Sequence, residues 1–528
     1  MREIDFWKDQ LVRGRIGRRE FFGRAAALGV STALATTMLA QVGIGAEPKP
    51  GGRFRVGSGH GSTTDLLDPG TWENEYTADI GRGLIGDALV IIDQKNSVVP
   101  NLAESLEPSD DAKSWVYKLR KGVTFHNGKT LTADDVVATY NYHRGENSKS
   151  AAKSALSTIT DIKADGPETV VFTLSGGSAD FPYITSDYHL PIFPSQDGAI
   201  NWADGIGTGP FILESFEPGV RGKFKRNPNY HGTAYFDEVE LLVIGDVSAR
   251  TNAFIAGDID YMDRCDLKTI ALLQRNPDVE VTNVTGFGHY VAPMNVTIPP
   301  FDNVDVRKAI KYSFDREEIV KKVLFGYGTA GNDNPIAPSI KFATQPEPVY
   351  KYDPDKVKFH LGKAGLSSLK VDFSAADAAF AGAVDAAILM QSHAAKVGID
   401  INVIREPNDG YWDNVWMKKP WTMSYWGGRP TVDWMMSTAY AAEAAWNDTF
   451  WKHPRFNELL VAARAETDEG KRAAMYAEMQ QILHDDGGII VLMFNNFVSA
   501  HSKKVAHGEL NSNYDHDGGH MYKRWWFV

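Results

Sequence analysis

Cys265 is the only cysteine in this chain of 528 residues. A single cysteine excludes an internal disulfide framework and any metal site built from several cysteines. The fold must therefore be held together by the burial of apolar side chains. The chain has enough of them, because 43% of its residues are hydrophobic and 23% are charged, as in ordinary globular proteins. Its length exceeds that of one domain, so we expect two to four lobes.

The first 46 residues are typical of an export signal. Arginines recur up to Arg24, a weakly apolar run follows from Ala25 to Ala40, and small residues continue to Ala46. Within this segment GRREFFG, at 17–23, resembles the twin-arginine pattern. We therefore expect export by the twin-arginine route, cleavage near Ala46 and a soluble periplasmic protein. A permanent membrane anchor is the alternative, but Ser and Thr dilute the run below the roughly 20 strongly apolar residues of a span.

The charge of the chain argues against nucleic acid as a partner. The whole chain has a net charge of −12. The first 46 residues hold seven basic and four acidic side chains, a net charge of +3, so the remaining residues carry a net charge of about −15. An acidic surface without a basic stripe repels nucleic acid and anionic lipid.

Motifs of catalysis and cofactor binding are missing. The sequence contains no H-E-x-x-H, no G-x-S-x-G and no GxxxxGK[ST]. GSGHGS at 57–62 has Ser62 where a dinucleotide fingerprint has its third glycine, and no helix pattern follows it. YDHDGGH at 514–520 is a weak metal candidate, since a solvated loop explains it as simply. Its four potential ligands are Asp515, His516, Asp517 and His520. We expect no cofactor, no metal and no catalysis.

Apolar periodicity predicts alternating strands and helices. A helix should begin after Thr132, which is a good N-cap with acidic residues in the first turn. Another should end at Gly257. The pattern further predicts a hairpin at 207–230, one long helical stretch at 304–326, a strand–helix–strand unit at 369–406, a closing helix at 456–488 and a core strand at 488–501.

Several segments, taken in order, resemble one known family. They are PNLAESLEPSDDAKSWVYKLRKGVTFHNGKTLTADDVVATYNYHR (100–144), GTGPF (207–211), AGDIDY (256–261), FDNVDVRKAIKYSFDREEIV (301–320), YDPDKVKFHLGKAG (352–365), AAKVGIDINV (394–403) and KRAAMYAEMQQILHDDGGIIVLMF (471–494). The chain is identified by them as a member of family 5 of bacterial solute-binding proteins, the peptide, nickel and opine receptors of ABC importers.

The resemblance implies an α/β fold of the periplasmic-binding-protein type II clamp, in which two α/β lobes surround a ligand cleft and a third α+β lobe is inserted. Hinge closure on a solute would shift the receptor from an open to a closed population, which the permease recognises. The implied segments are a signal at 1–46, lobe I at 47–90, 207–293 and 497–528, lobe II at 91–206, and lobe III at 294–496.

The stretch SYWGGRPTVDWMMS at 424–437 departs from the family pattern at one position. In peptide-binding relatives a lobe III loop has the form Trp-x-x-Asp, whose carboxylate holds the α-ammonium of the peptide. Trp426 matches this tryptophan, but Arg429 occupies the position of the acid. Either Asp433 takes over the ammonium role, or the ligand presents an anion to Arg429. A third possibility is that Arg429 and Asp433 pair with each other.

Aromatic residues are concentrated around this stretch, because seven of the 13 tryptophans lie between Trp412 and Trp451. From lobe I, the glycine-rich loop with His60 is the expected opposing wall, although His60 could equally face solvent. The expected ligand-binding residues are Trp426, Gly427, Gly428, Arg429, Asp433, Trp434, Trp446, Asn447, Trp412 and His60.

The combined prediction is a monomeric periplasmic receptor of an ABC importer that is not an enzyme. Its ligand would be a small polar solute that is zwitterionic or carries a carboxylate, such as a short peptide or an opine-like amino-acid conjugate. The alternatives are a twin-arginine-exported enzyme with an unrecognised active site, a receptor for a metal chelate of the nickel type, and an exported chaperone-like binder.

Overall fold

The structure is a computed structural model that describes residues 4, 7, 18–28, 30 and 48–528, apart from 73, 154, 408–410 and 445, with the backbone alone for 18, 19, 412 and 413. The expected cleavage site near Ala46 and most of the apolar run lie outside these residues. In the described part of the N-terminal segment, helix α2 (Arg18–Ala27) packs Phe21 and Ala25 against Ile4. No helix of the described residues is both long and apolar enough to cross a membrane.

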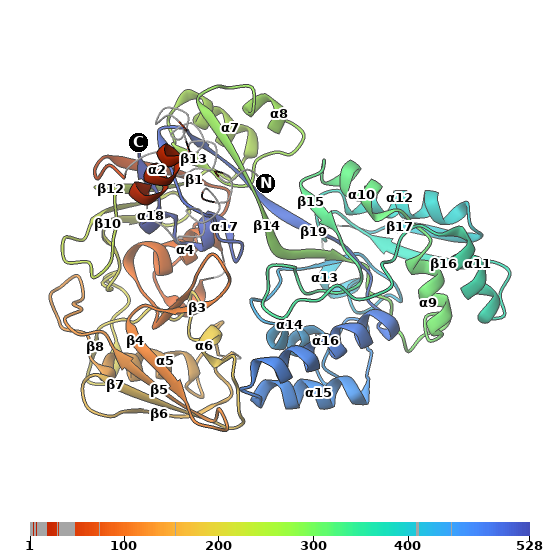
Figure 1. Cartoon of the computed structure of the whole chain (residues 1–528), viewed down its shortest axis with the longest axis horizontal. Coiled ribbons are helices and arrows are strands. Elements are labelled where there is room, and N and C mark those ends of the chain that lie inside the picture. The colour runs from red at the N-terminus through yellow and green to blue at the C-terminus, as the bar shows by residue number, and fades with distance from the viewer. Residues whose placement is uncertain are drawn as a thin grey trace.

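The largest element is a nine-stranded sheet that extends through both halves of the molecule (Figure 1). Strands β12 and β13 pair with β1 in parallel, and the other pairings within this sheet are antiparallel. In order the strands are β10 (Phe211–Glu217), β11 (Arg221–Arg226), β12 (Glu238–Val243), β1 (Arg53–Ser58), β13 (Tyr261–Met262), β19 (Val491–Ser502), β14 (Val279–Val291) and β18 (Ser424–Trp426), with β15 (Gly328–Ala330) paired to β19.

Strands β14 and β19 carry the chain between the two halves (Figure 1). They pair in regular antiparallel register from Val279 opposite Ser502 to Thr285 opposite Asn496. The register then shifts, because the three residues 286–288 of β14 lie opposite the single residue Asn495 of β19. A bulge of this kind bends a strand pair and weakens its ladder locally. Both strands therefore run from one half into the other, but the hydrogen-bond ladder between them is interrupted near its middle.

The expected lobe II contains a separate four-stranded antiparallel sheet with its own apolar core. Its helix α5 (Ala133–Arg144) begins as predicted, with Thr132 and Asp135 forming a capping box. Alternate residues of its central strands are buried, among them Trp115, Tyr117 and Phe172. The strand order is β4 (Ala103–Pro108), β5 (Ser114–Leu119), β7 (Thr169–Leu174) and β6 (Ile159–Ala164).

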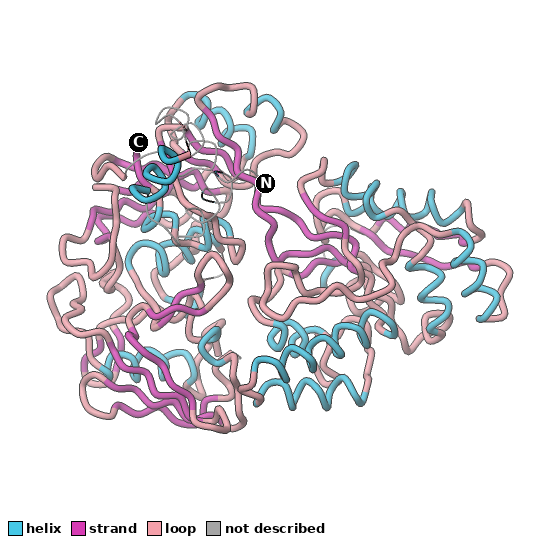
Figure 2. The backbone as a smooth tube through the Cα atoms, viewed as in Figure 1, coloured by secondary structure: helices cyan, strands magenta, loops and turns pink. Residues whose placement is uncertain are grey.

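The expected lobe III contains the predicted strand–helix–strand unit, in which β16 (Leu369–Ala375) and β17 (Ile399–Arg405) are parallel and α12 (Ala383–Ala395) connects them. Helix α11 (Pro354–Lys363) precedes this unit. Figure 2 shows strands at the centre of this half and helices on its outer sides.

Two predicted helices are each divided in the structure. The stretch 304–326 forms α9 (Val304–Lys311) and α10 (Arg316–Val323), and the closing stretch forms α15 (Pro454–Ala465) and α16 (Glu469–Asp486). At each break an aspartate is the N-cap of the second helix: Asp315 accepts a bond from the Glu318 amide and Asp468 from the Lys471 amide. Both caps have extended backbone conformations, so neither stretch forms one continuous helix, although the apolar spacing continues across each break.

The predicted hairpin, the helix that ends at Gly257 and the core strand are confirmed as β10–β11, α7 (Val247–Ala256) and β19. Short elements complete the described chain: η1 (Pro69–Thr71), α4 (Glu75–Asp79), the π-helical turn η2 (Ile80–Ile85), β2 (Val90–Ile92), β3 (Val98–Pro100), α6 (Phe181–Ile184), β8 (Ser195–Gln196), β9 (Ala199–Ile200), α8 (Ile270–Leu273), α13 (Tyr411–Asn414), α14 (Val432–Ala439), β20 (Val505–Ala506), α17 (Asp515–Gly518), α18 (Met521–Arg524) and β21 (Trp526–Phe527).

Candidate functional site

The stretch 424–437 forms a strand, a loop and a helix at the edge of the large sheet. Strand β18 pairs with β14, so that Tyr425 lies opposite Tyr290 and Trp426 opposite His289. Helix α14 then begins at Thr431, whose hydroxyl accepts a hydrogen bond from the Trp434 amide at 3.1 Å. The loop 427–430 therefore connects a strand end to a helix start and is held at both sides.

Glycine is required in this loop at one of the two positions. Gly428 has φ +76°, and a Cβ there would lie 2.4 Å from the Cβ of Phe287 in β14. A Cβ on Gly427, in contrast, would meet nothing within 4 Å. The loop thus packs its backbone closely against the bulge of β14, and the following residue, Arg429, projects from that support.

Arg429 does not pair with Asp433. The Asp433 carboxylate binds Arg464 of α15, with an Nε–Oδ1 distance of 3.1 Å, and burial raises its pKa to about 6 while Arg464 opposes that shift. Arg429 donates to the Gly428 carbonyl at 2.6 Å, and its guanidinium lies 5.9 Å from the centre of the Trp434 ring. Within the described residues no carboxylate forms an ion pair with Arg429. The Arg429 guanidinium, a strong hydrogen-bond donor, therefore has no anionic partner among these residues.

The charge of Arg429 influences a residue of the C-terminal segment. Burial raises the pKa of Tyr514 to about 12, and the positive charge of Arg429 is among the effects that oppose this rise. Tyr514 immediately precedes α17, which lies on the side of its half that faces β14 and β19 (Figure 1). Arg429 and Tyr514 come from segments that are far apart in the sequence, and the charge of Arg429 acts on Tyr514.

A second arginine lies on the side of His60. Arg264 pairs with Asp515 at 3.0 Å, and its side chain remains 45% exposed. Burial lowers the pKa of His60, and the charge of Arg264 lowers it further. The same charge opposes the burial-driven rise in the pKa of Tyr290 on β14. His60 and Arg264 therefore share one wall, next to the strand that leads into the other half.

The glycine-rich loop around His60 binds a carboxylate of the chain itself. The Gly59 amide donates to both oxygens of Asp263, at 2.9 and 3.0 Å. Asp263 in turn contacts Arg250, with an Nε–Oδ1 distance of 3.2 Å. The Gly59 amide is therefore already bound within the chain.

The tryptophans of this region have different environments. Trp426 is only 6% exposed and belongs to the apolar core around α14, α15 and α16, whereas Trp446 is 51% exposed. Their ring centres are 6.1 Å apart, and Trp416 lies 6.4 Å from Trp426 on another side. Trp446 is therefore the aromatic surface that a solute could reach, with Trp426 supporting it. The side chain of Trp412 lies outside the described residues.

Asn447 and Asp448 are both buried. The Asn447 amide group donates to the carbonyls of Trp451, at 2.6 Å, and Ala441, at 3.3 Å, and so closes the surrounding loop. Asp448 accepts a bond from the Trp416 indole at 3.2 Å, and burial raises its pKa to about 7. No cation among the described residues pairs with Asp448. Sequence reasoning did not predict the burial and raised pKa of the Asp448 carboxylate, because no local sequence pattern indicates that this residue is buried.

Residues of 91–206 and 294–496, the expected lobes II and III, contact each other. Asp180 pairs with Arg472 of α16 at 2.7 Å, and the Ala179 amide donates to the Arg464 carbonyl at 2.8 Å. Farther along, the Asn96 side chain donates to the Ser339 carbonyl at 2.8 Å. A cavity of about 210 Å³ lies between the two lobes. Its lining includes Trp115, Tyr183, Phe342, Pro430, Thr431 and Arg472.

The side chains of YDHDGGH do not converge on one point. Asp515 pairs with Arg264, His516 with Asp79 and Asp263, and Asp517 with Arg524. Burial lowers the pKa of His516, but Asp79 and Asp263 together raise it well above its ordinary value. The histidine is therefore held as a cation between two carboxylates, which is unsuitable for a metal ligand.

Comparisons with known proteins agree with this architecture. Residues 97–448 match the family model of bacterial extracellular solute-binding proteins, family 5 Middle. The chain is 26% identical over 450 residues to the dipeptide-binding protein of Escherichia coli (strain K12), covering 77% of this chain and 83% of that protein. It is 25% identical over 468 residues to the glutathione-binding protein GsiB of Escherichia coli O6:K15:H31 (strain 536 / UPEC), covering 84% and 90%.

Among solved structures, the periplasmic binding protein AgaA of A. tumefaciens R10, in complex with agropinic acid, superposes with a TM-score of 0.72. The two are 23% identical, and the alignment covers 90% of this chain and 99% of that one. The predicted fold class, an α/β clamp of the type II periplasmic binding proteins with an inserted lobe, is thereby confirmed. Since the family model covers about two thirds of the chain, this protein belongs to family 5 of the bacterial extracellular solute-binding proteins, the solute receptors of ABC importers.

Proposed function

We propose that this protein is a periplasmic receptor that closes on a small solute bearing a carboxylate, and that Arg429 binds this carboxylate. The observation that carries the proposal is the state of Arg429, which donates to the Gly428 carbonyl and has no anionic partner among the described residues. A planar guanidinium binds a carboxylate through two parallel hydrogen bonds. Such charge-assisted bonds contribute roughly 1.5–3 kcal/mol each.

The chemistry of the relatives supports this ligand class. They are named for a dipeptide and glutathione, and the aligned structure holds agropinic acid. All three ligands carry a carboxylate. Short peptides and opine-like conjugates are therefore the solutes proposed here, in preference to a nickel-type metal chelate or to the reaction of an enzyme.

Some of the other site residues would contact the ligand in this proposal, and others would only hold the loop in place. Trp434, whose ring centre lies 5.9 Å from the Arg429 guanidinium, and the exposed Trp446 would provide apolar walls, and His60 with Arg264 would form the opposite wall. Trp426, Gly427 and Gly428 shape the loop, and Trp412 remains a proposed ligand-binding residue. Asp433 and Asn447 act indirectly, because they already bind Arg464 and backbone carbonyls.

Closure would occur about the bulge of β14 and β19, which is the local weakness in the connection between the halves. The division into lobes I, II and III belongs to the same proposal and is supported by the separate apolar clusters of the core. Export by the twin-arginine route is proposed from GRREFFG, and the receptor is proposed to act as a monomer.

The test is a fluorescence titration that uses the tryptophans of the site. Glutathione, the dipeptide Met-Leu and agropinic acid are the probes, and Met-Leu amide is the ligand control. We expect a saturable response to at least one carboxylate probe, with weaker binding of its amide. Mass spectrometry of the recovered probe should show that it is chemically unchanged, which distinguishes a receptor from an enzyme.

Arg429→Gln should weaken the binding of that probe at least tenfold, the equivalent of about 1.4 kcal/mol. The melting temperature should stay nearly constant, because Arg429 makes one backbone hydrogen bond and one ring contact with the described part of the chain. Arg455→Gln is the matched control, since Arg455 is a surface arginine of the same lobe that pairs with Glu478. Equal binding by Arg429→Gln and the wild type would remove Arg429 from the site.

A further inference from the structure

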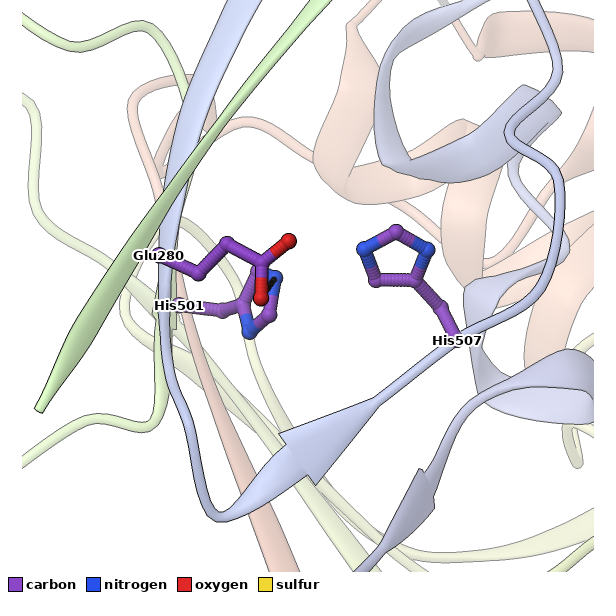
Figure 3. Close-up of side chains that lie close together, drawn as sticks. All are labelled: Glu280, His501 and His507. Carbon is purple, nitrogen blue, oxygen red and sulfur yellow. Dashed lines mark ion pairs between the residues drawn. The ribbon is translucent and has the colours of Figure 1, made fainter. Parts of the chain in front are cut away.

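Glu280, His501 and His507 lie together at the lobe I end of the two long strands (Figure 3). Glu280 on β14 is directly opposite His501 on β19 in the register of the sheet. His507 follows β20 and approaches from the C-terminal segment. Along β14, Glu280 is roughly 30 Å from His289, which neighbours the solute site, at about 3.3 Å per residue. The cluster is therefore separate from the proposed solute site.

The three side chains present ligand atoms to a common point. One such atom of each residue lies within 4.8 Å of those of the other two, and the distance from His501 Nε2 to Glu280 Oε2 is 4.0 Å. The other ring nitrogens are already bound: His501 Nδ1 to the Ser502 carbonyl at 3.0 Å, and His507 Nδ1 to the Gly508 carbonyl at 2.7 Å. A carbonyl only accepts, so each Nδ1 carries the proton and each Nε2 offers a lone pair.

His501 gives an independent indication that something binds here. Its side chain is fully buried, and its Nε2 has no hydrogen-bond partner among the described residues. A buried polar atom without a partner is uncommon in proteins and requires an explanation.

We propose that Glu280, His501 and His507 bind a divalent transition-metal ion of the zinc type, with a water molecule as the fourth ligand. Two imidazoles and one carboxylate are a ligand set that zinc accepts in tetrahedral geometry. Bonds of about 2.0–2.2 Å require ligand atoms roughly 3.3 Å apart. The observed 4.0 Å separation therefore needs a shift of less than about 1 Å, and Glu280 is free to make it because its side chain is 51% exposed.

The surroundings also suit such a metal. The two carbonyls on the Nδ1 atoms orient the imidazoles, as outer hydrogen bonds do in known sites. The Trp525 ring stacks on His507, with centres 4.6 Å apart, and lies 5.1 Å from His501, which makes one wall apolar. A second group, Glu75, Asp79 and His516, has similar spacing, but His516 already binds two aspartates and offers no lone pair.

A bound ion would connect β14, β19 and the C-terminal segment in lobe I. Because it would bind the folded chain, it should stabilise that chain by mass action. The test uses tag-free full-length protein that has been treated with a chelator and then titrated with Zn²⁺ in a calorimeter. We expect one saturable site and a rise in melting temperature with Zn²⁺, and no comparable response to Mg²⁺, which prefers oxygen ligands.

Glu280→Gln and His507→Gln should each weaken Zn²⁺ binding at least about tenfold and abolish the rise in melting temperature. Glu107→Gln, which replaces an exposed strand glutamate of lobe II, is the matched control and should bind Zn²⁺ like the wild type. Circular dichroism checks that each variant is folded. His501→Gln is avoided because that side chain is buried. No Zn²⁺ binding by the wild type, or undiminished binding by both variants, would overturn the proposal.

Discussion

At the scale of single residues, the same type of side chain has opposite roles according to its partners. Asp433 and Asp448 lie 15 positions apart, and both are largely withdrawn from solvent. The negative charge of Asp433 is balanced by an ion pair with Arg464, whereas Asp448 accepts a hydrogen bond from the neutral indole of Trp416. The pKa of Asp448, about 7, is accordingly farther from the ordinary value of 3.8 than that of Asp433, about 6.

Asp448→Asn should change the pH dependence of stability. Because the folded pKa is raised, the folded state keeps a proton that the unfolded state releases between about pH 4 and pH 7. The wild type therefore loses stability as pH rises through that window, by up to roughly 4 kcal/mol. The Asn variant lacks this loss, so its stability relative to the wild type should increase from pH 4 to pH 7 and then level off.

Urea unfolding at several pH values measures this difference. Asp110→Asn, on the surface of lobe II, is the control and should follow the wild-type profile. A constant difference between Asp448→Asn and the wild type across the whole window would contradict the buried, uncompensated state of Asp448.

At the scale of elements, helix boundaries are decided by capping. The stretch 454–486 has helical apolar spacing almost throughout, yet it is divided into α15 and α16. The Asp468 carboxylate accepts a hydrogen bond from the Lys471 amide at 2.9 Å and so satisfies an amide that a new helix leaves free. The break sets the two helices side by side, and it places Arg464 and Arg472 at the contact with lobe II.

Asp468→Ala should lower the free energy of unfolding by about 1 kcal/mol, within a range of roughly 0.5–2 kcal/mol for lost N-caps. Urea denaturation gives the value. Asp355→Ala is the comparison, since Asp355 lies in the first turn of α11 while Asp353 provides the cap of that helix. The idea fails if both substitutions have the same effect.

At the scale of the whole molecule, lobes II and III are held together by few polar contacts. One of them is the ion pair between Asp180 and Arg472, whose side chains are 12% and 7% exposed. Arg472 also binds the Ala463 carbonyl and the Tyr476 hydroxyl within its own lobe. If the clamp opened, Arg472 would therefore lose its ion pair with Asp180 and keep its other two hydrogen bonds.

Asp180→Asn should shift the molecule toward an open form, because it leaves a buried guanidinium that solvent reaches only when the lobes separate. A charge-assisted bond of roughly 1.5–3 kcal/mol corresponds to an increase of about tenfold or more in the ratio of open to closed molecules. Small-angle X-ray scattering of the ligand-free protein should report a larger radius of gyration. Glu443→Gln breaks an exposed pair with Lys452 inside lobe III and should leave the scattering unchanged. A wild-type profile for Asp180→Asn would show that this pair does not hold the lobes together.

Much of the fold could be predicted because its signals are local. The capping box at Thr132, the glycine end of α7 and the strand–helix–strand unit of lobe III all depend on residues within a few positions of each other. The divided helices were missed because apolar spacing continues across both breaks, and a single aspartate outweighs it. The candidate loop at 424–437 was also recognised locally, as tryptophan and glycine next to opposite charges.

What the sequence determined by itself is the order of elements, the family and the presence of Arg429 three positions after Trp426. Only the tertiary structure decided which charges meet. Asp433 pairs with Arg464, 31 positions away, and Arg429 has no carboxylate partner among the described residues. Glu280 meets His501 across 221 positions, because the register of β14 and β19 places them opposite each other. The physical reason is that ion pairs and metal ligands depend on distances of a few ångströms in space, and those distances are set by the packing of remote segments.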